Sequence, residues 1–235
     1  MTGRGSLYGV GVGPGDTELL TLKAARLLHE VKVIAYPVAE GSESLARSIV
    51  APLIPESAIE LPIAFPIRDS GPPAAAYDAG AARIRVHLDA AENVLFLCEG
   101  DPFLYGSFMY IHQRLAGDYK TIVVPGVSSL TACAAALGRP LAARRDVLKV
   151  LPALLPEARL REELQSAEAA AIIKVGRSFT KVRQVLRDLG LEPHAALVEN
   201  ATQAGETVYR LADVPDAHDE YFSTILVYRG GQSWQ

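Results

Sequence analysis

Two carboxylates follow directly on an apolar stretch near the middle of the chain. Glu99 and Asp101 lie in the run Cys-Glu-Gly-Asp-Pro-Phe-Leu-Tyr-Gly at residues 98–106. Residues 94–98 have the composition of a buried strand, and open α/β sheets bind ligands at the C-terminal ends of their strands. Carboxylates there accept hydrogen bonds from hydroxyl or ammonium groups, and glycines let backbone groups approach a ligand closely. The run therefore predicts a ligand site around Glu99, Gly100 and Asp101.

Two further glycine loops are expected directly after strands. Residues 9–16 read Gly-Val-Gly-Val-Gly-Pro-Gly-Asp, and residues 125–129 read Pro-Gly-Val-Ser-Ser. The first loop fails the dinucleotide fingerprint, because Pro14 or Asp16 stands where its third glycine must be. It does contain the Gly-x-Gly-x-Gly spacing of the common methyltransferase fold, but the next strand lacks the acidic residue that would hold a ribose. The first loop is thus either a ligand site or a plain turn, and the serines of the second loop are either ligands or a helix N-cap.

The elements that must position these loops alternate between strand and helix along the first half of the chain. Expected strands are residues 7–12, 31–35, 58–61, 94–98 and 121–124. Expected helices are residues 17–31, 43–50, 74–91, 104–115 and 130–137. This alternation predicts an α/β fold with a mostly parallel sheet covered by helices. Since Gly138-Arg139-Pro140 breaks the pattern, we expect two α/β domains, at residues 1–140 and 141–235.

The expected second domain is smaller and mixed. Its expected strands are residues 147–151, 170–175, 195–198, 206–211 and 222–228, and its expected helices are residues 156–165 and 180–189. The last two strands are joined by an acidic loop without a helix, so antiparallel pairing between them is expected. His218 lies in this loop, where a solvated position is favoured over a metal-ligand role.

Composition and charge exclude several classes of protein. Hydrophobic residues make up 49% and charged residues 21% of the 235 residues, which is typical of a globular chain rather than a disordered one. The net charge of −4 and the dispersed basic residues argue against a nucleic-acid partner. Cys98 and Cys133 lack metal-ligand spacing, so no metal site is expected. Because the apolar runs are too short to span a membrane and the N-terminus lacks a signal-peptide pattern, we expect no membrane partner and a cytoplasmic protein.

The ordered set of loops resembles the tetrapyrrole methylase family. The segments that carry the resemblance are residues 12–16, 100–102, 105–106 and 125–129, with 197–201 and 224–227 similar to the family's C-terminal motifs. The resemblance implies two α/β domains of the tetrapyrrole methylase type, S-adenosyl-L-methionine in the cleft between them, and a homodimer. The positions that match the family's cofactor contacts are Pro14, Glu99, Gly100, Asp101, Leu104, Ser128, Ser129, Val175 and Ala201.

Within the family, the chain looks most like the branch that methylates precorrin-2 at C-20 in cobalamin synthesis. This likeness rests on residues 19–25, 36–37 and 99–108. Pro37 stands where uroporphyrinogen-III methylases carry an aspartate, and Ala201 replaces a glycine that is common in relatives. The implied substrate is a tetrapyrrole polycarboxylate. It is precorrin-2 or, as alternatives, cobalt-factor II or another precorrin.

Methyl transfer from a sulfonium to an electron-rich carbon requires alignment of the reacting atoms and a base for the proton that is lost. The sequence leaves this base unassigned among Glu99, Tyr36 and Tyr105, whereas Asp101 is better suited to hold the cofactor. Residues 69–73 are either a lid over the substrate or a passive loop. The basic side chains that either hold the substrate's carboxylates or are merely solvated are Arg144, Arg145, Arg177 and Lys181.

Two other classes of function stay open on the residues alone. An NAD-dependent oxidoreductase is suggested by the glycines at residues 9–15, although their spacing fails its fingerprint. A non-catalytic module that binds the cofactor is compatible with the chain, because no indispensable catalytic side chain is evident in it.

Overall fold

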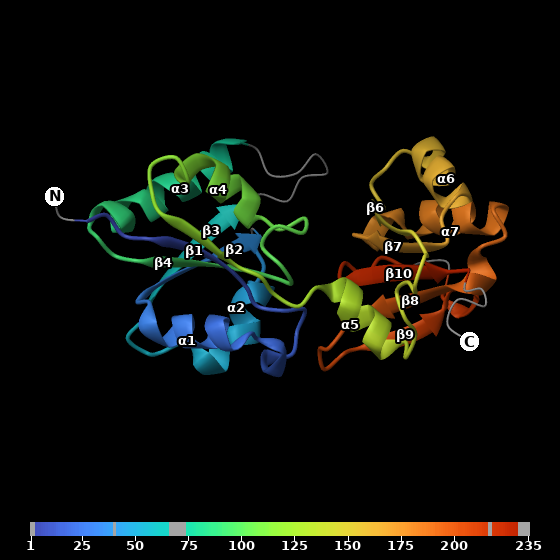
Figure 1. Cartoon of the computed structure of the whole chain (residues 1–235), viewed down its shortest axis with the longest axis horizontal. Helices are drawn as coiled ribbons and strands as arrows, with labels where there is room; N and C mark the ends of the chain where they lie inside the picture. The colour runs from blue at the N-terminus through green and yellow to red at the C-terminus, as the bar shows by residue number, and fades with distance from the viewer. Residues whose placement is uncertain (1–2, 40, 66–73, 216–217, 230–235) are drawn as a thin grey trace. The chain divides into compact units, whose positions relative to one another are not determined.

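The computed structural model describes residues 3–39, 41–65, 74–215 and 218–229 (Figure 1). The chain divides into two compact units, Met1–Ser128 and Ser129–Gln235, and each unit contains one five-stranded sheet with helices on both faces. This architecture confirms the predicted α/β fold class. The segment at residues 69–73, predicted as a lid or a passive loop, lies outside the described residues.

The first unit is built on a parallel sheet with the strand order β3-β2-β4-β1-β5. Its strands are β1 (Leu7–Gly11), β2 (Val33–Ala39), β3 (Ile59–Phe65), β4 (Val94–Cys98) and β5 (Thr121–Val124). The five residues of β4 are Val-Leu-Phe-Leu-Cys, and all are buried. An uninterrupted apolar run of this length is typical of a central parallel strand that is covered on both faces.

Helices cover both faces of this sheet (Figure 1). They are α1 (Leu22–Glu30), α2 (Leu45–Val50), α3 (Ala74–Asp89) and α4 (Phe108–Leu115). Because alternate residues of a strand point to opposite faces, Leu95 and Leu97 pack with α1 and α2, whereas Phe96 packs with α3 and α4. The helices that follow β1 and β4 thus lie on opposite faces. The C-terminal ends of these two strands form the switch point at which open α/β sheets bind ligands.

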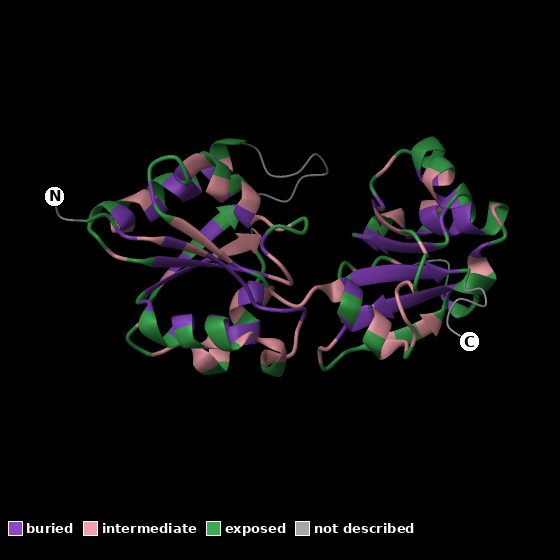
Figure 2. Cartoon of the chain, in the orientation of Figure 1, coloured by how far each residue is buried: buried purple, intermediate pink, exposed green. Residues whose placement is uncertain are grey.

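The second unit contains a mixed sheet with the order β6-β7-β10-β8-β9, in which only β6 and β7 run parallel as neighbours. The strands are β6 (Leu148–Pro152), β7 (Ala169–Ile173), β8 (Ala195–Glu199), β9 (Thr207–Arg210) and β10 (Ser223–Tyr228). Its helices are α5 (Ser129–Ala136), α6 (Glu157–Gln165) and α7 (Phe179–Asp188). Figure 2 shows the strands of both sheets as mostly buried between partly exposed helices.

The second unit begins earlier than the expected boundary at residues 140/141. Helix α5, which the sequence assigned to the first domain, packs its buried residues Leu130 and Cys133 against the second sheet, where they contact Val198 and Leu226 among others. The helices α6 and α7 cover the opposite face of that sheet. The break at Gly138-Arg139-Pro140 therefore lies within the second unit, between α5 and the strands of the sheet that α5 covers. It does not mark the boundary between the two units.

The expected pairing of the two last strands is wrong. β9 and β10 do not pair with each other, because β8 lies between them and each is antiparallel to β8. All but the last residue of β8 are buried, whereas β9 alternates between half-buried and exposed residues. An apolar strand is best covered by two neighbours, and the more polar strand takes the edge of the sheet.

Short 3-10 helices complete the connections, at Thr17–Leu19, Ala51–Leu53, Gly176–Ser178, Glu192–His194 and Leu211–Asp213. Within the described ranges, no helix combines the length and the apolar character needed to cross a bilayer.

Candidate functional site

The loops that follow β1 and β4 meet at the switch point of the first sheet. Gly13 and Gly100 form an antiparallel bridge, in which Gly100 N donates to Gly13 O at 2.8 Å and Gly13 N donates to Gly100 O at 3.3 Å. Gly13 has a φ of 78°, a conformation that favours glycine, and Pro14 is buried in the same turn. The structure therefore brings the first two predicted loops into direct contact.

Close backbone packing explains two of the glycines. A Cβ atom added to Gly11 would lie 2.5 Å from Gly100 O and 2.6 Å from Gly126 Cα. A Cβ atom added to Gly126 would overlap the same carbonyl oxygen of Gly100. The three loops after β1, β4 and β5 are thus fixed against one another by their main chains, since a side chain at either glycine would separate them.

Asp101 holds two of these loops together with its carboxylate. Its Oδ1 accepts hydrogen bonds from the backbone nitrogens of Phe103 at 2.9 Å and Leu104 at 3.2 Å. Its Oδ2 accepts a hydrogen bond from Gly126 N, in the β5 loop, at 3.1 Å. Leu104, one of the predicted cofactor contacts, is 39% exposed beside this network. Asp101 therefore orders the loop that presents Leu104.

The candidate base Glu99 is engaged with the neighbouring helix. Its Oε1 accepts a hydrogen bond from Ala46 N in the first turn of α2, at 3.3 Å. The candidate base Tyr105 lies in the β4 loop, exposed and with a φ of 55°. A non-glycine residue in this conformation costs about 1 kcal/mol or more, which the surrounding loop must offset. Glu99 thus links the loop to α2, while Tyr105 is held in a strained, exposed position.

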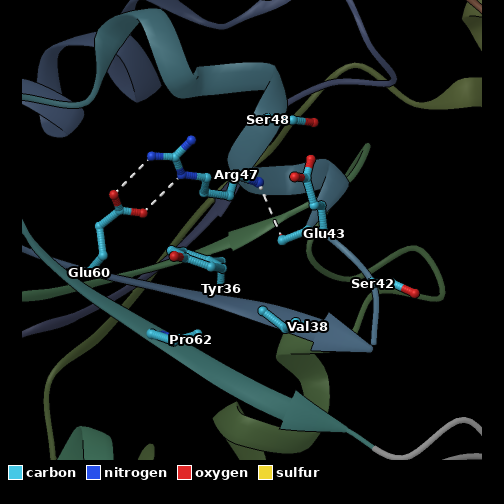
Figure 3. A pocket seen from close by; sticks show the side chains of 9 residues that line it. Tyr36, Val38, Ser42, Glu43, Arg47, Ser48, Glu60 and Pro62 are labelled. Carbon is cyan, nitrogen blue, oxygen red and sulfur yellow. Dashed lines mark hydrogen bonds and ion pairs between the residues drawn. The ribbon is translucent and has the colours of Figure 1, made fainter. Parts of the chain in front are cut away.

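The third candidate base, Tyr36, lines an open pocket between α2 and the strands β2 and β3 (Figure 3). The pocket has a volume of about 350 Å³. The other residues that line it are Val38, Ser42, Glu43, Ser44, Arg47, Ser48, Glu60 and Pro62. Arg47 donates from Nε and Nη2 to the two carboxylate oxygens of Glu60, each at 2.9 Å.

The surroundings of Tyr36 oppose its ionisation. Burial raises the pKa of the Tyr36 phenol, and Glu60 beside it raises that pKa further, while Arg47 acts in the opposite sense. A phenol whose pKa lies above its ordinary value keeps its proton at neutral pH. Tyr36 is therefore suited to donate a hydrogen bond rather than to accept the proton lost in catalysis.

The Arg47–Glu60 pair makes the stability of the first unit depend on pH. Hydrogen bonds from Arg47 lower the pKa of the Glu60 carboxyl below its ordinary value of 4.5. A carboxyl with a lowered pKa in the folded state stabilises the protein above its unfolded pKa, and this contribution is lost as the pH falls through the folded pKa. Glu60→Gln is therefore expected to lower the free energy of unfolding at about pH 7 but much less at about pH 3. Urea unfolding of both proteins at the two pH values measures this, and a difference that does not change with pH would contradict it.

In the second unit, Val175 and Ala201 lie at the same end of the sheet. Both residues are buried, and they follow β7 and β8, which run in the same direction on either side of β10. Backbone strain is concentrated at this end, with positive φ values at Lys174, Asn200 and Thr202. The structure thus places the two cofactor contacts predicted for this unit at one end of the sheet, in core clusters on its opposite faces. Ser128 and Ser129 stand at the start of α5.

The four basic candidates do not form one group. Arg177 follows β7 and is two residues from Val175 in the sequence. Lys181 is committed to the backbone, because its Nζ donates to Ala153 O at 2.6 Å and to Leu155 O at 2.7 Å. Arg144 and Arg145 are exposed in a turn before β6. Since β6 and β7 are parallel, this turn lies at the opposite end of the sheet from Val175.

His218 is not solvated, contrary to the expectation from its acidic loop. Its side chain is only 9% exposed, and its Nδ1 lies 3.1 Å from Glu199 Oε1. Its ring packs edge-on against Phe179, with the centroids 4.7 Å apart. Among the described residues, no cluster of side chains suited to a metal ion is found. The carboxylate at the end of β8 draws the histidine inward, and this contact between distant segments leaves no trace in the local sequence.

Sequence analysis also missed Arg47 and Glu60, the ion pair of the pocket. They lie on α2 and β3, and no motif spacing connects them. The one available signal is Glu60 itself, a charged residue in the otherwise apolar strand Ile-Glu-Leu-Pro-Ile-Ala-Phe.

Comparison with known proteins places these loops in a family context. The model of the Tetrapyrrole (Corrin/Porphyrin) Methylases matches residues 6–215. The cobalamin biosynthesis protein CobIJ of Mycobacterium tuberculosis is 41% identical over 98% of this chain, which spans only 47% of that protein's length. The precorrin-2 C(20)-methyltransferase of a Sinorhizobium species is 39% identical, over 96% of both chains. The cobalt-precorrin-2 C(20)-methyltransferase of Salmonella typhimurium is 34% identical, over 95% of this chain and 96% of that protein.

A solved structure shares the fold over nearly the whole chain. It is the uroporphyrin-III C-methyl transferase of Thermus thermophilus complexed with S-adenyl homocysteine, which is 25% identical with a TM-score of 0.72. The match covers 96% of this chain and 98% of the other. The loops that meet at the switch point belong to the segment that the family model covers, and the agreement extends through both sheets. The chain is a member of the tetrapyrrole methylase family.

Proposed function

We propose that this protein is an S-adenosyl-L-methionine-dependent methyltransferase that methylates precorrin-2 at C-20 in cobalamin synthesis. The observation that carries the proposal is the set of three loops fixed together at the switch point, with Gly13 bridged to Gly100 and Asp101 bonded to Gly126. The relative from Sinorhizobium supports the choice of substrate, since it matches over nearly the full length of both chains. The proposal also includes a homodimer in the cytoplasm, as the family resemblance implies.

The cofactor supplies a methyl carbon that is activated by a sulfonium sulfur. We propose that the residues that hold it are Pro14, Glu99, Gly100, Asp101, Leu104, Ser128, Ser129, Val175 and Ala201. The loops fit such a ligand, because they meet at the C-terminal ends of β1 and β4, where open α/β sheets bind ligands, and Leu104 is partly exposed there. Asp101 acts on this site by ordering the loops through its three backbone hydrogen bonds. The chain's own contribution is then to align donor and acceptor, which supplies roughly 7–11 kcal/mol in well-oriented reactions.

A base must accept the proton that the meso carbon loses. The raised pKa of Tyr36 opposes its ionisation, and we therefore set it aside as the base. Glu99 and Tyr105 are the two that we retain, and both lie in the β4 loop beside the proposed donor site. Arg177 is the basic residue that we retain at the Val175 end of the second sheet.

The proposed reaction is tested by incubating the purified protein with precorrin-2 and a methyl-labelled donor. The expected product carries one labelled methyl group at C-20, and label at another ring position would contradict the substrate assignment. A parallel assay with cobalt-factor II addresses the metal-containing alternative, which the Salmonella relative favours. Donor binding without turnover would indicate a binding module. Tight binding of NAD without binding of S-adenosylhomocysteine in calorimetric titrations would indicate an oxidoreductase.

A further inference from the structure

The pocket beside α2 combines an apolar side with a polar one (Figure 3). Tyr36 and Val38 from β2, with Pro62 from β3, contribute an aromatic ring and aliphatic carbons. Arg47 and Ser44 contribute hydrogen-bond donors from α2 and its N-cap position. A ligand group that fits both sides has a short aliphatic stem and a polar head.

The guanidinium of Arg47 is held by Glu60 but does not use all of its hydrogen-bond donors in that pair. A guanidinium has two edges that each match a carboxylate, one formed by Nε and Nη2 and the other by Nη1 and Nη2. Glu60 occupies the first edge. The Tyr36 phenol also interacts with the guanidinium, and in the described part of the chain Nη1 makes no further hydrogen bond and the side chain is 41% exposed. The ion pair thus fixes the side chain in place and leaves its second edge available to a ligand.

The pocket adjoins the proposed donor site. Ala46, the residue before Arg47 on α2, donates its backbone N–H to Glu99 at the start of the β4 loop. Ser44 at the start of the same helix is bonded to Arg47 N at 3.3 Å. Helix α2 therefore connects the pocket to the β4 loop through one hydrogen bond, so the pocket and the proposed donor site share an element.

We infer that this pocket binds one carboxylate-bearing side chain of the tetrapyrrole substrate, with the carboxylate on the open edge of Arg47 and the aliphatic carbons against Tyr36 and Val38. The inference rests on the proposed function for the identity of the macrocycle. The periphery of precorrin-2 carries acid groups on short aliphatic stems, which is the group that the two sides of the pocket fit. Arg47 is then a specificity-determining residue that orients the ring relative to the donor.

Glu43 allows a test of whether the pocket binds an acidic or a cationic group. Since Arg47 and Glu60 neutralise each other, Glu43 at the exposed rim is the charge without a counter-ion among the described residues that line the pocket. It repels an acid group and would attract a cationic one. Neutralising Glu43 must therefore tighten the binding of an acid, and neutralising Arg47 must weaken it. A cationic ligand would reverse both signs.

The experiment measures the binding of coproporphyrin, a stable tetrapyrrole with propionate groups, by fluorescence titration, together with the KM for precorrin-2. Arg47→Gln is expected to weaken both about tenfold, the loss of one charge-assisted contact, and Glu43→Gln to strengthen both about threefold. Arg26→Gln is the matched control, because it also breaks an Arg–Glu pair, with Glu30 on α1, but does not line the pocket. The double variant Arg47→Gln with Glu60→Gln removes both members of the ion pair, so Glu60 is not left without its partner, and binding is expected to be weakened to a similar degree.

The outcomes separate the two proposals. Wild-type protein that does not bind coproporphyrin, or an Arg47→Gln variant that behaves like Arg26→Gln, overturns the pocket assignment even where precorrin-2 is methylated. Weakening by Glu43→Gln with tightening by Arg47→Gln also overturns it, in favour of a cationic ligand. Loss of coproporphyrin binding in Arg47→Gln, in a protein that fails to methylate precorrin-2, supports the pocket and rejects only the proposed reaction.

Discussion

Replacing Gly126 by alanine is expected to unfold the junction of the three loops and to abolish measurable cofactor binding. The added Cβ would overlap the carbonyl oxygen of Gly100 and would come within 2.8 Å of Gly11 Cα, and both neighbours are backbone that cannot rotate away. Overpacking of this kind costs about 3 kcal/mol, which lowers the melting temperature by about 6–12 °C in a chain of this size. Thermal melts and calorimetric titration with S-adenosylhomocysteine measure the two effects.

Gly117→Ala is the control for this substitution. Gly117 follows α4 in the same unit, and an added Cβ would meet no atom within 4 Å. Its stability is expected to stay within about 0.5 kcal/mol of the wild type. A Gly126→Ala protein that melts and binds like the Gly117→Ala protein would show that the three loops are not in backbone contact.

Asp101→Ala is expected to weaken the binding of S-adenosylhomocysteine about 100-fold and to destabilise the first unit by about 3 kcal/mol. The substitution removes the acceptor of three backbone N–H groups, those of Phe103, Leu104 and Gly126. Without it, the β4 loop is no longer tied to the β5 loop, and Leu104 is no longer held in place. Isothermal titration and urea unfolding measure the two losses.

Asp101→Asn separates the local turn from the contact between loops. An asparagine oxygen can still accept the bonds from Phe103 and Leu104, but its NH₂ group then faces Gly126 N–H, donor against donor. We expect the affinity for S-adenosylhomocysteine and the stability of Asp101→Asn to lie between those of the wild type and those of Asp101→Ala. Asp118→Ala, which breaks an exposed ion pair with Arg85, is the control and should cost less than about 1 kcal/mol. Equal binding by wild type and Asp101→Ala would mean that the carboxylate does not order the site.

Local sequence patterns predicted the strands that lead into the site. The expected strands at residues 94–98 and 121–124 coincide with β4 and β5, because short apolar runs bounded by polar or glycine residues mark buried strands. The helix expected from residue 104 begins only at Phe108. The hydrophobic periodicity does not reveal this later start. The backbone N–H groups of Phe103 and Leu104 donate to Asp101 Oδ1, which holds these residues in a turn before the helix.

Features that depend on the order of the strands in a sheet could not be predicted from the sequence. Arg144 and Arg145 looked equivalent to Arg177 as substrate ligands, but the parallel register of β6 and β7 places them at the far end of the second sheet. The position of β8 between β9 and β10 was likewise not predictable, because the neighbours of a strand depend on the whole sheet and not on its local sequence. The Arg47–Glu60 pair joins two elements that only the fold brings together.

The position of α5 determines where the polypeptide can be cut. A fragment that begins at Ser129 retains the helix whose Leu130 and Cys133 shield Val198 and Leu226 from water. A fragment that begins after the Gly138-Arg139-Pro140 break would leave that side of the sheet bare, an exposed apolar surface of the kind that drives aggregation. Separate expression of the C-terminal half, or its fusion to another protein, should therefore start before the helix and not after it.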